Sequence, residues 1–400
     1  MNRRYSASAV LTAAVAAGLL ATTAVPAHST GTDNAAQPSS SSSAAGSENG
    51  YALDRPSQHG PGTYKVTVTN LEPRVRTVLD RDDINLLALS SLVSRDGVPM
   101  GACDEGDRCW EWPDEVDDDL WYPQGLTGSR ESMWSGYQGT EVVVSAWYRR
   151  ATEADHTSTA SQLRFVTPNT DTPSYRTVTL MHATGSGALS PLEIHAGGAA
   201  WAGPYLYVAD TDRLFRFDVR QLMQDSGGNP LLVPDRRYDA LNDASTPLGE
   251  AVFSSISTDW SGSRRSLVSA QYTDDHDVAP NVVRWPLRAG GALASSDGVV
   301  GSTDNLLIDT DSDVYKVQGV EAHGDTYYFS QSDGYLDRRR AMSNGSKGRM
   351  DWGQSGFGPW RGSDVPQDLY GVVDYGMFGQ TEEDGDQRLF FHEWEALFTD

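Results

Sequence analysis

Cysteine is scarce in this sequence, and so are basic residues. The 400 residues include only Cys103 and Cys109, both within the segment CDEGDRC. Two thiols are too few for a zinc site, and a close pair in an exported chain indicates a local disulfide. The chain has 31 basic against 55 acidic residues, a formal net charge of -24. A surface of this sign repels phosphate backbones, which excludes nucleic acid as a partner and favours a cation or a neutral or basic ligand.

Long apolar runs are also absent after the first 30 residues, so we expect no membrane span. The start of the chain combines basic Arg3 and Arg4, an Ala-, Leu- and Val-rich run over residues 9–25 and a small-residue cleavage site at Ala27. This order predicts a secretion signal peptide over residues 1–27. We therefore expect the mature protein to be secreted, extracellular and monomeric.

Several catalytic signatures are missing as well. The sequence has no Gly-x-Ser-x-Gly motif, no second histidine one turn after His392-Glu393, and no glycine-rich phosphate loop. Ordinary serine esterases, zinc proteases of the His-Glu-x-x-His type and nucleotide-binding enzymes are therefore disfavoured.

Residues 28–62 are rich in Ser, Ala, Gly and Pro and predict a disordered linker.

What the sequence contains after this linker is a repeat. The segment HAGGAAWAGPYLYVADTDRLFRFDVR, residues 195–220, alternates apolar and polar side chains as half-buried strands do. Similar segments begin near residues 123, 196, 253, 317 and 366. Their spacing of roughly 50 to 70 residues is typical of a four-stranded blade with its loops.

The best copy resembles a known repeat. LYVADT (206–211) and FRFD (215–218) are similar to the repeat of NHL-type and gluconolactonase-like β-propellers, and to uncharacterised secreted propeller proteins of actinobacteria. The resemblance implies an all-β fold, a β-propeller over residues 63–400. We favour five blades over six, the sixth being sought in residues 63–120. We also expect the strand TYKVTVTN (63–70) to complete the last blade.

In a propeller, the innermost strand of each blade faces a central channel, so equivalent positions of the copies form a ring. The positions at one level are Gln124, Gly197, Ser254, Gln318 and Gln367, with His195 just before and Thr127, Asp259, Glu321 and Tyr370 further along. We predict ligand binding by Gln124, Gln318, Gln367, Tyr370 and Trp201, and catalytic roles for Glu321, Asp259 and His195. Alternatively, the glutamines bond the neighbouring blade's backbone and His195 is structural.

Acidic clusters make a divalent metal such as Ca²⁺ a candidate cofactor. Asp309, Asp311 and Asp313 alternate as at the start of a calcium loop, although the usual glycine and distal glutamate are missing. A second acidic cluster lies in and after the cysteine loop, at Asp104, Glu105, Asp107 and residues 117–119. A solvated acidic loop is the alternative at both places.

Three functions remain open. The first is binding or cleavage of an extracellular glycan, or of another small polar ligand, at the channel mouth by a lectin-like protein, a glycoside hydrolase or a lyase. Cleavage would use Asp259 and Glu321 as the carboxyl pair, with Glu321 as the acid. The second, which the gluconolactonase-like resemblance implies, is a metal-dependent lactonase-like hydrolase. The third is a non-catalytic protein-interaction scaffold.

Overall fold

β-Strands dominate the part of the chain that the structure describes. The computed structural model describes residues 53–54 and 61–393, except for 104–107, 114–119, 133–136, 169–171, 242–252, 262–264, 276, 279, 309–313, 325, 333–334, 341–347, 352–365, 373–374 and 383–386. Within these residues the fold is all-β, with four short helices. The helices are α1 (Glu72–Leu79), α2 (Leu89–Val93), α3 (Ser129–Ser132) and the 3-10 helix η1 (Val219–Gln221).

The described strands form five sheets. In hydrogen-bonded order, the first contains β7 (Trp121–Gly128), β8 (Val143–Arg150), β9 (Ser158–Thr167), β10 (Ser174–Ala183), β16 (Pro230–Leu232), β15 (Met223–Asp225) and β3 (Ile84–Leu86), with β4 (Val98–Pro99) and β11 (Leu189–Pro191) paired to β10. The second contains, in the same order of pairing, β12 (Ala199–Ala202), β13 (Tyr205–Asp210), β14 (Arg213–Asp218), β17 (Arg236–Ala240), β2 (Lys65–Asn70) and β21 (Val299–Gly301).

The other three sheets follow along the chain. The third contains β18 (Ser255–Asp259), β19 (Ser266–Ala270), β20 (Asn281–Pro286), β22 (Asp304–Ile308) and β1 (Leu53–Asp54). The fourth contains β23 (Val317–His323), β24 (Thr326–Gln331), β25 (Tyr335–Arg340) and β26 (Gly348–Asp351). The fifth contains β27 (Pro366–Val372), β28 (Gly376–Thr381), β29 (Arg388–Glu393), β6 (Cys109–Glu111) and β5 (Gly101–Ala102).

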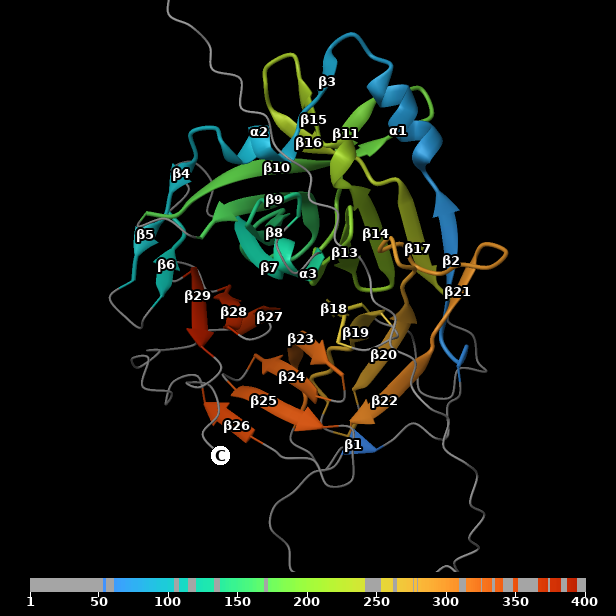
Figure 1. Cartoon of the computed structure of the whole chain (residues 1–400), viewed down its shortest axis with the longest axis vertical. Coiled ribbons are helices and arrows are strands. Elements are labelled where there is room, and N and C mark those ends of the chain that lie inside the picture. The colour runs from blue at the N-terminus through green and yellow to red at the C-terminus, as the bar shows by residue number, and fades with distance from the viewer. Residues whose placement is uncertain are drawn as a thin grey trace, which may run out of the picture. The chain divides into compact units, whose positions relative to one another are not determined.

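Each of the five sequence copies begins near a strand at one edge of a different sheet, and we call this edge strand the first strand of its sheet. These first strands are β7, β12, β18, β23 and β27, and each contacts the next in that order, while β27 returns to contact β7. In Figure 1, β7, β18, β23 and β27 surround the centre of the view. The sheets are therefore joined through a cycle of their first strands, and we call this group of five strands the hub.

Glycine explains how the hub strands come so close. A Cβ on Gly198 would lie 2.6 Å from the amide nitrogen of Ile256 on β18. Gly125 on β7 faces the backbone of Gly198 and Ala199 in the same way, and Gly319 on β23 faces the backbone of β27. The recurring glycine of the sequence copies thus leaves room for backbone-to-backbone packing between neighbouring sheets.

The N-terminal strands correct one expectation. β2 lies within the segment TYKVTVTN, yet it pairs with β17 of the second sheet and with β21, where Val66 is buried. The fifth sheet is instead extended by β6, whose Trp110 pairs with Leu389 of β29. We expected this strand to pair with the last copy of the repeat. The edge of β17 is equally open to a strand of alternating apolar and polar residues, and β2 pairs there.

Residues 63–120 add strands to existing sheets. Their described strands, β2 to β6, join the second, first and fifth sheets and form no separate sheet there. β1 lies within the segment expected to be a linker, residues 28–62, and pairs with β22 through Leu53 and Ile308. The rest of that segment up to residue 60, and the expected signal peptide over residues 1–27, lie outside the described residues.

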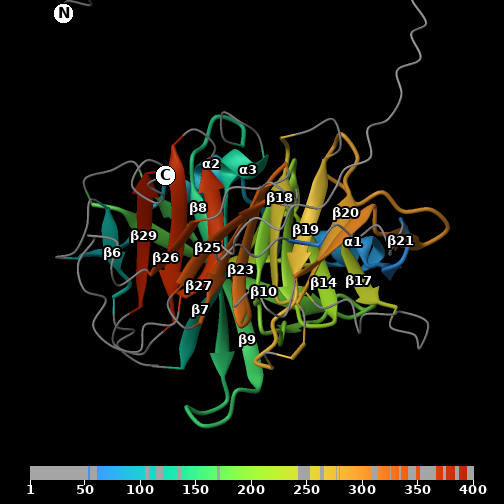
Figure 2. The same cartoon turned by 90° about the horizontal axis from the view of Figure 1, so that it is seen from below.

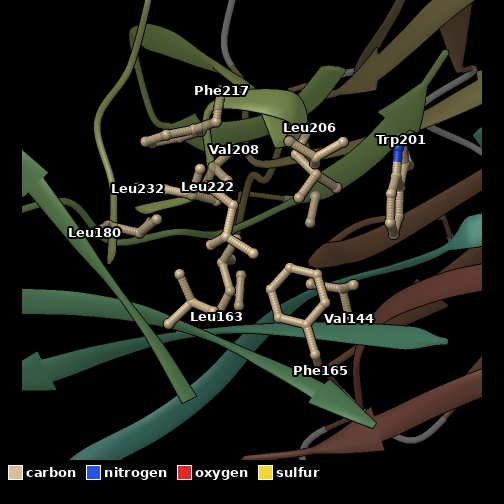
Figure 3. Packing of buried hydrophobic residues seen from close by; sticks show 14 of the residues in the cluster. Val144, Leu163, Phe165, Leu180, Trp201, Leu206, Val208, Phe217, Leu222 and Leu232 are labelled. Atoms are coloured by element: carbon tan, nitrogen blue, oxygen red, sulfur yellow. The ribbon is translucent and has the colours of Figure 1, made fainter. Parts of the chain in front are cut away.

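Apolar side chains fill the space between neighbouring sheets. Val144, Leu163 and Phe165 of the first sheet point toward Leu206 and Val208 of the second (Figure 3), and all five are buried in one cluster. A second cluster joins the second sheet to the third. Burial on both faces is what stacked sheets require.

Candidate functional site

A cavity of about 530 Å³ lies where the hub strands β18, β23 and β27 end, beside α3. Figure 2 shows α3 at one end of the neighbouring strands. The polar and aromatic residues of its lining are Arg130, Glu131, Ser132, Thr258, Trp260, Ser261, Arg265, Glu321 and His323. Two carboxyl groups therefore face a cavity of the size that holds small ligands.

Glu321 is the carboxyl group best placed to meet a ligand. It lies on β23 with 6% of its surface exposed. Its Oε2 accepts a hydrogen bond from the backbone N–H of Gly371 at 3.2 Å, and the structure describes no donor to Oε1. Burial raises the pKa of this carboxyl well above its ordinary range, and the charge of Glu131 raises it further. Burial thus favours the protonated form of Glu321, and its Oε1 is left for a ligand.

Gly371 leaves the space that Glu321 occupies. A Cβ at this position would lie 2.7 Å from Cγ and 2.8 Å from Cδ of Glu321. We therefore expect Gly371→Ala to displace the carboxyl group and to lower ligand affinity by about tenfold. Isothermal titration against a ligand that binds the wild type measures this effect. Gly185→Ala is the control, because no atom lies within 4 Å of its new Cβ, and equal affinity of the two variants would contradict the expectation.

Glu131, on α3, connects three hub strands. Its Oε1 accepts from the backbone N–H of Thr258 at 3.0 Å, and its Oε2 accepts from the backbone N–H of Trp201 at 3.2 Å and from the hydroxyl of Thr127. Burial raises its pKa to about 7, although these hydrogen bonds lower it in part. Sequence reasoning missed Glu131 because it follows the first strand of its copy and has no counterpart in the others.

Asp259 does not line the cavity, so it is not the second carboxyl group beside Glu321. Its Oδ1 accepts from the amide and the hydroxyl of Ser261, at 2.9 and 2.6 Å. Its Oδ2 accepts from Arg284 at 2.6 Å and from the amide of Gly324 at 3.0 Å. Asp259 is buried and outside the cavity lining. The carboxyl beside Glu321 is therefore Glu131.

Two of the predicted glutamines meet elsewhere. Glu382 accepts from Nε2 of Gln367 at 2.8 Å, from Arg150 at 2.5 Å and from Gln124. Arg150 also donates to the hydroxyl of Tyr148 at 2.6 Å, and the ring centre of His195 lies 4.5 Å from that of Tyr148, so His195 is near this group.

None of these residues lines the cavity. Burial lowers the pKa of His195 to about 4, helped by the charge of Arg150, so His195 is neutral at physiological pH. Gln318 is half-buried on β23 and is also outside the lining. The predicted ring of glutamines is thus separated from the carboxyl groups, which lie toward the other end of the hub strands.

Both aromatic residues of the prediction lie in the interior. Trp201 is fully buried in the cluster of Figure 3, and its indole N–H donates to the carbonyl of Gly203 at 2.9 Å. Tyr370 is buried against Phe378, with ring centres 5.6 Å apart. Neither side chain lines the described cavity.

Asp368 is a buried carboxyl that the repeat pattern did not reveal. It stands on β27 directly after Gln367, where the copy beginning at Pro123 has Gly125 after Gln124. Its Oδ2 accepts from the backbone N–H groups of Leu126 and Ala199, each at 3.0 Å. It therefore links β27 to both β7 and β12, and burial raises its pKa well above the ordinary range.

The proposed calcium ligands all lie in segments that the structure does not describe. Asp309, Asp311 and Asp313 lie outside the described residues, as do Asp104, Glu105, Asp107 and residues 117–119. In the part that is described, no three His, Cys, Asp or Glu side chains are grouped to hold a metal. The disulfide is confirmed: Cys103 and Cys109 are joined.

Comparison with known proteins adds little. No protein-family model matches the sequence, and no curated protein matches it. A similar solved structure is the glutaminyl cyclase of Myxococcus xanthus, at 14% sequence identity over 74% of this chain and 97% of that chain, with a TM-score of 0.36. Among the described helices, none is long and apolar enough to cross a membrane.

Proposed function

We propose that the five sheets are the blades of a secreted five-bladed β-propeller, and that the cavity at its hub binds and cleaves an extracellular glycan. The cyclic contacts of β7, β12, β18, β23 and β27 support the propeller. The disulfide between Cys103 and Cys109 is compatible with an extracellular location.

The cavity offers the contacts that a sugar needs. Trp260 supplies an aromatic surface, although one face of its ring is 4.8 Å from the guanidinium of Arg265. Glu321 and Thr258 supply hydrogen-bonding groups beside it. Aromatic rings pack against the C–H faces of a sugar, while polar groups bond its hydroxyls, and this combination favours a glycan over a purely apolar ligand.

The buried carboxyl of Glu321 at the cavity wall is the observation that carries the proposal of cleavage. A buried acid with a raised pKa can donate its proton to the glycosidic oxygen as the bond to the anomeric carbon breaks. Water then adds to the anomeric carbon, and its proton returns to the Glu321 carboxylate. Glu131, with a pKa of about 7, supplies negative charge beside the oxocarbenium ion that develops on the sugar. Its oxygens are held by three donors, which suits electrostatic stabilisation better than nucleophilic attack.

We expect Glu321→Gln to reduce turnover at least about 100-fold, because the amide cannot donate the proton. Activity of the wild type should rise as Glu131 ionises, at a pKa of about 7, and fall as pH rises through the raised pKa of Glu321, since the reaction uses the charge of the first carboxyl and the proton of the second. The measurement is a glycan array on the mature protein, followed by reducing-sugar release from the bound glycans over pH 4–9. Glu153→Gln changes an exposed carboxylate and is the matched control.

The same assay separates the other functions. Binding without release of sugar would leave a lectin and remove the catalytic role of Glu321. Hydrolysis of lactones that EDTA abolishes would favour the metal-dependent lactonase-like alternative. A protein that binds no glycan at all would overturn the proposal and leave the interaction scaffold.

A further inference from the structure

A second cavity adjoins the first. It has a volume of about 220 Å³, and Arg130 and Val372 line both cavities. These two residues are therefore the common wall, one contributed by α3 and the other by the end of β27. A ligand that is too long for the central cavity would therefore extend into the second cavity across the side chains of Arg130 and Val372.

The second cavity is lined mainly by aromatic rings. The rings belong to Trp110 of β6, Tyr375 of the turn after β27, Phe378 of β28 and Phe391 of β29. Phe378 and Phe391 pack against each other, with ring centres 4.7 Å apart. Tyr375 is 56% exposed and belongs to none of the described core clusters, so its ring is accessible from the cavity and from solvent.

Charged groups hold the exposed ring in place. The guanidinium of Arg130 lies 5.0 Å from the ring centre of Tyr375. Arg130 itself donates to both carboxylate oxygens of Glu141, at 2.6 and 3.0 Å. Such a two-point contact fixes the plane of the guanidinium. Because the Tyr375 ring packs against this guanidinium, this edge of the cavity is fixed as well.

Another part of the lining comes from a distant part of the sequence. Trp110 is placed by β6, which pairs with β29, and the adjoining Cys109 is joined to Cys103. This part of the cavity therefore belongs to a strand that the last sheet takes from the N-terminal half of the chain.

We propose that this second cavity is a subsite for the sugar residue next to the one bound in the central cavity, so that the ligand is an oligosaccharide or polysaccharide. The inference rests on the proposed function. Aromatic rings beside an Arg–Glu pair offer a stacking surface together with hydrogen-bonding groups, which is the chemistry of a sugar ring rather than of a lipid. The shared wall at Arg130 places the two sugars in sequence.

The test compares ligands of different length. Chito-, xylo- and uronate-oligosaccharides of one to six residues, labelled at the reducing end, are titrated against the full chain. We expect Tyr375→Ala to weaken binding of the di- and trisaccharide of the bound series by about tenfold, and of the monosaccharide by less than about twofold. Tyr375→Phe should restore the affinity, because the ring is kept. Tyr272→Ala removes another exposed tyrosine outside both cavities and is the control.

Each result decides between the two proposals. If Tyr375→Ala leaves the gain in affinity with chain length unchanged while Glu321→Gln abolishes turnover, the second subsite is refuted and the proposed function stands. Equal weakening for the monosaccharide and the longer ligands also refutes it, since the ring would then act on the central cavity. Absence of binding across the three series refutes both.

Discussion

Gly198→Ala is expected to lower the free energy of unfolding by about 3 kcal/mol. The added Cβ would lie 2.6 Å from the amide nitrogen of Ile256 and 2.7 Å from Cα of Ser255. Both atoms belong to the backbone of β18, which cannot rotate aside as the end of a side chain can. The neighbouring sheet must move instead, and with it the interface that both sheets bury.

Urea unfolding followed by tryptophan fluorescence measures this loss, because the core contains several buried tryptophans, among them Trp147, Trp201 and Trp285. Gly185→Ala is the control, since nothing lies within 4 Å of its added Cβ, and we expect its stability within about 0.5 kcal/mol of wild type. Equal stability of the two variants would mean that the hub strands are not held at this close distance.

Asp368→Ala is expected to cost about 3 kcal/mol, for a different reason. Its carboxyl oxygen Oδ2 accepts from two buried amides, those of Leu126 and Ala199. Removing the carboxyl leaves both N–H groups without an acceptor in the interior, and each unpaired group costs about 1–3 kcal/mol. Part of this cost is offset, because the variant no longer buries a polar carboxyl group.

Asp368→Asn provides the matched comparison. Its amide oxygen can accept both hydrogen bonds, as Oδ2 of the carboxyl does, so we expect stability within about 1 kcal/mol of wild type at pH 5. Burial raises the pKa of Asp368, so its favourable contribution exists at low pH and is lost as pH rises through the raised pKa. The asparagine cannot ionise and should therefore gain on the wild type as pH increases.

Thermal unfolding of the three proteins between pH 5 and pH 9 tests both parts of this expectation. Glu131 and Glu321 titrate in all three, so their effect largely cancels in the comparison. A pH-independent difference between asparagine and wild type would show that Asp368 is ionised throughout the range. An alanine variant as stable as the asparagine variant would refute the bridging role.

The sequence predicted the repeat well, because alternation and glycine are local signals. The five copy starts coincide with β7, β12, β18, β23 and β27, and the glycines at 125, 198 and 319 recur because backbones meet there. Strand pairing across long distances has no such signal. Val66 and Val68 alternate equally well for any free sheet edge, so the sequence could not tell whether β2 joins the second sheet or the fifth.

Glu321 and Asp259 illustrate how far site prediction reached. Both positions were placed on first strands, and both are buried in the structure. The sequence could not tell that Arg284 and Gly324 occupy one oxygen of Asp259, or that Gly371 leaves an oxygen of Glu321 open. Glu131 and Asp368 were missed because each departs from the repeat, and departures are visible only when the copies are superposed in space.

The pairing of β6 with β29 also has a consequence for how the protein acquires its structure. Glu111 must find Arg388, and Lys65 must find Gly301, before the fifth and second sheets are complete. Contacts of such high sequence separation make folding slow, and they postpone it until the end of the chain has been synthesised. Until then β6 and β28 present free edges, so a product ending before β29 would be prone to aggregate.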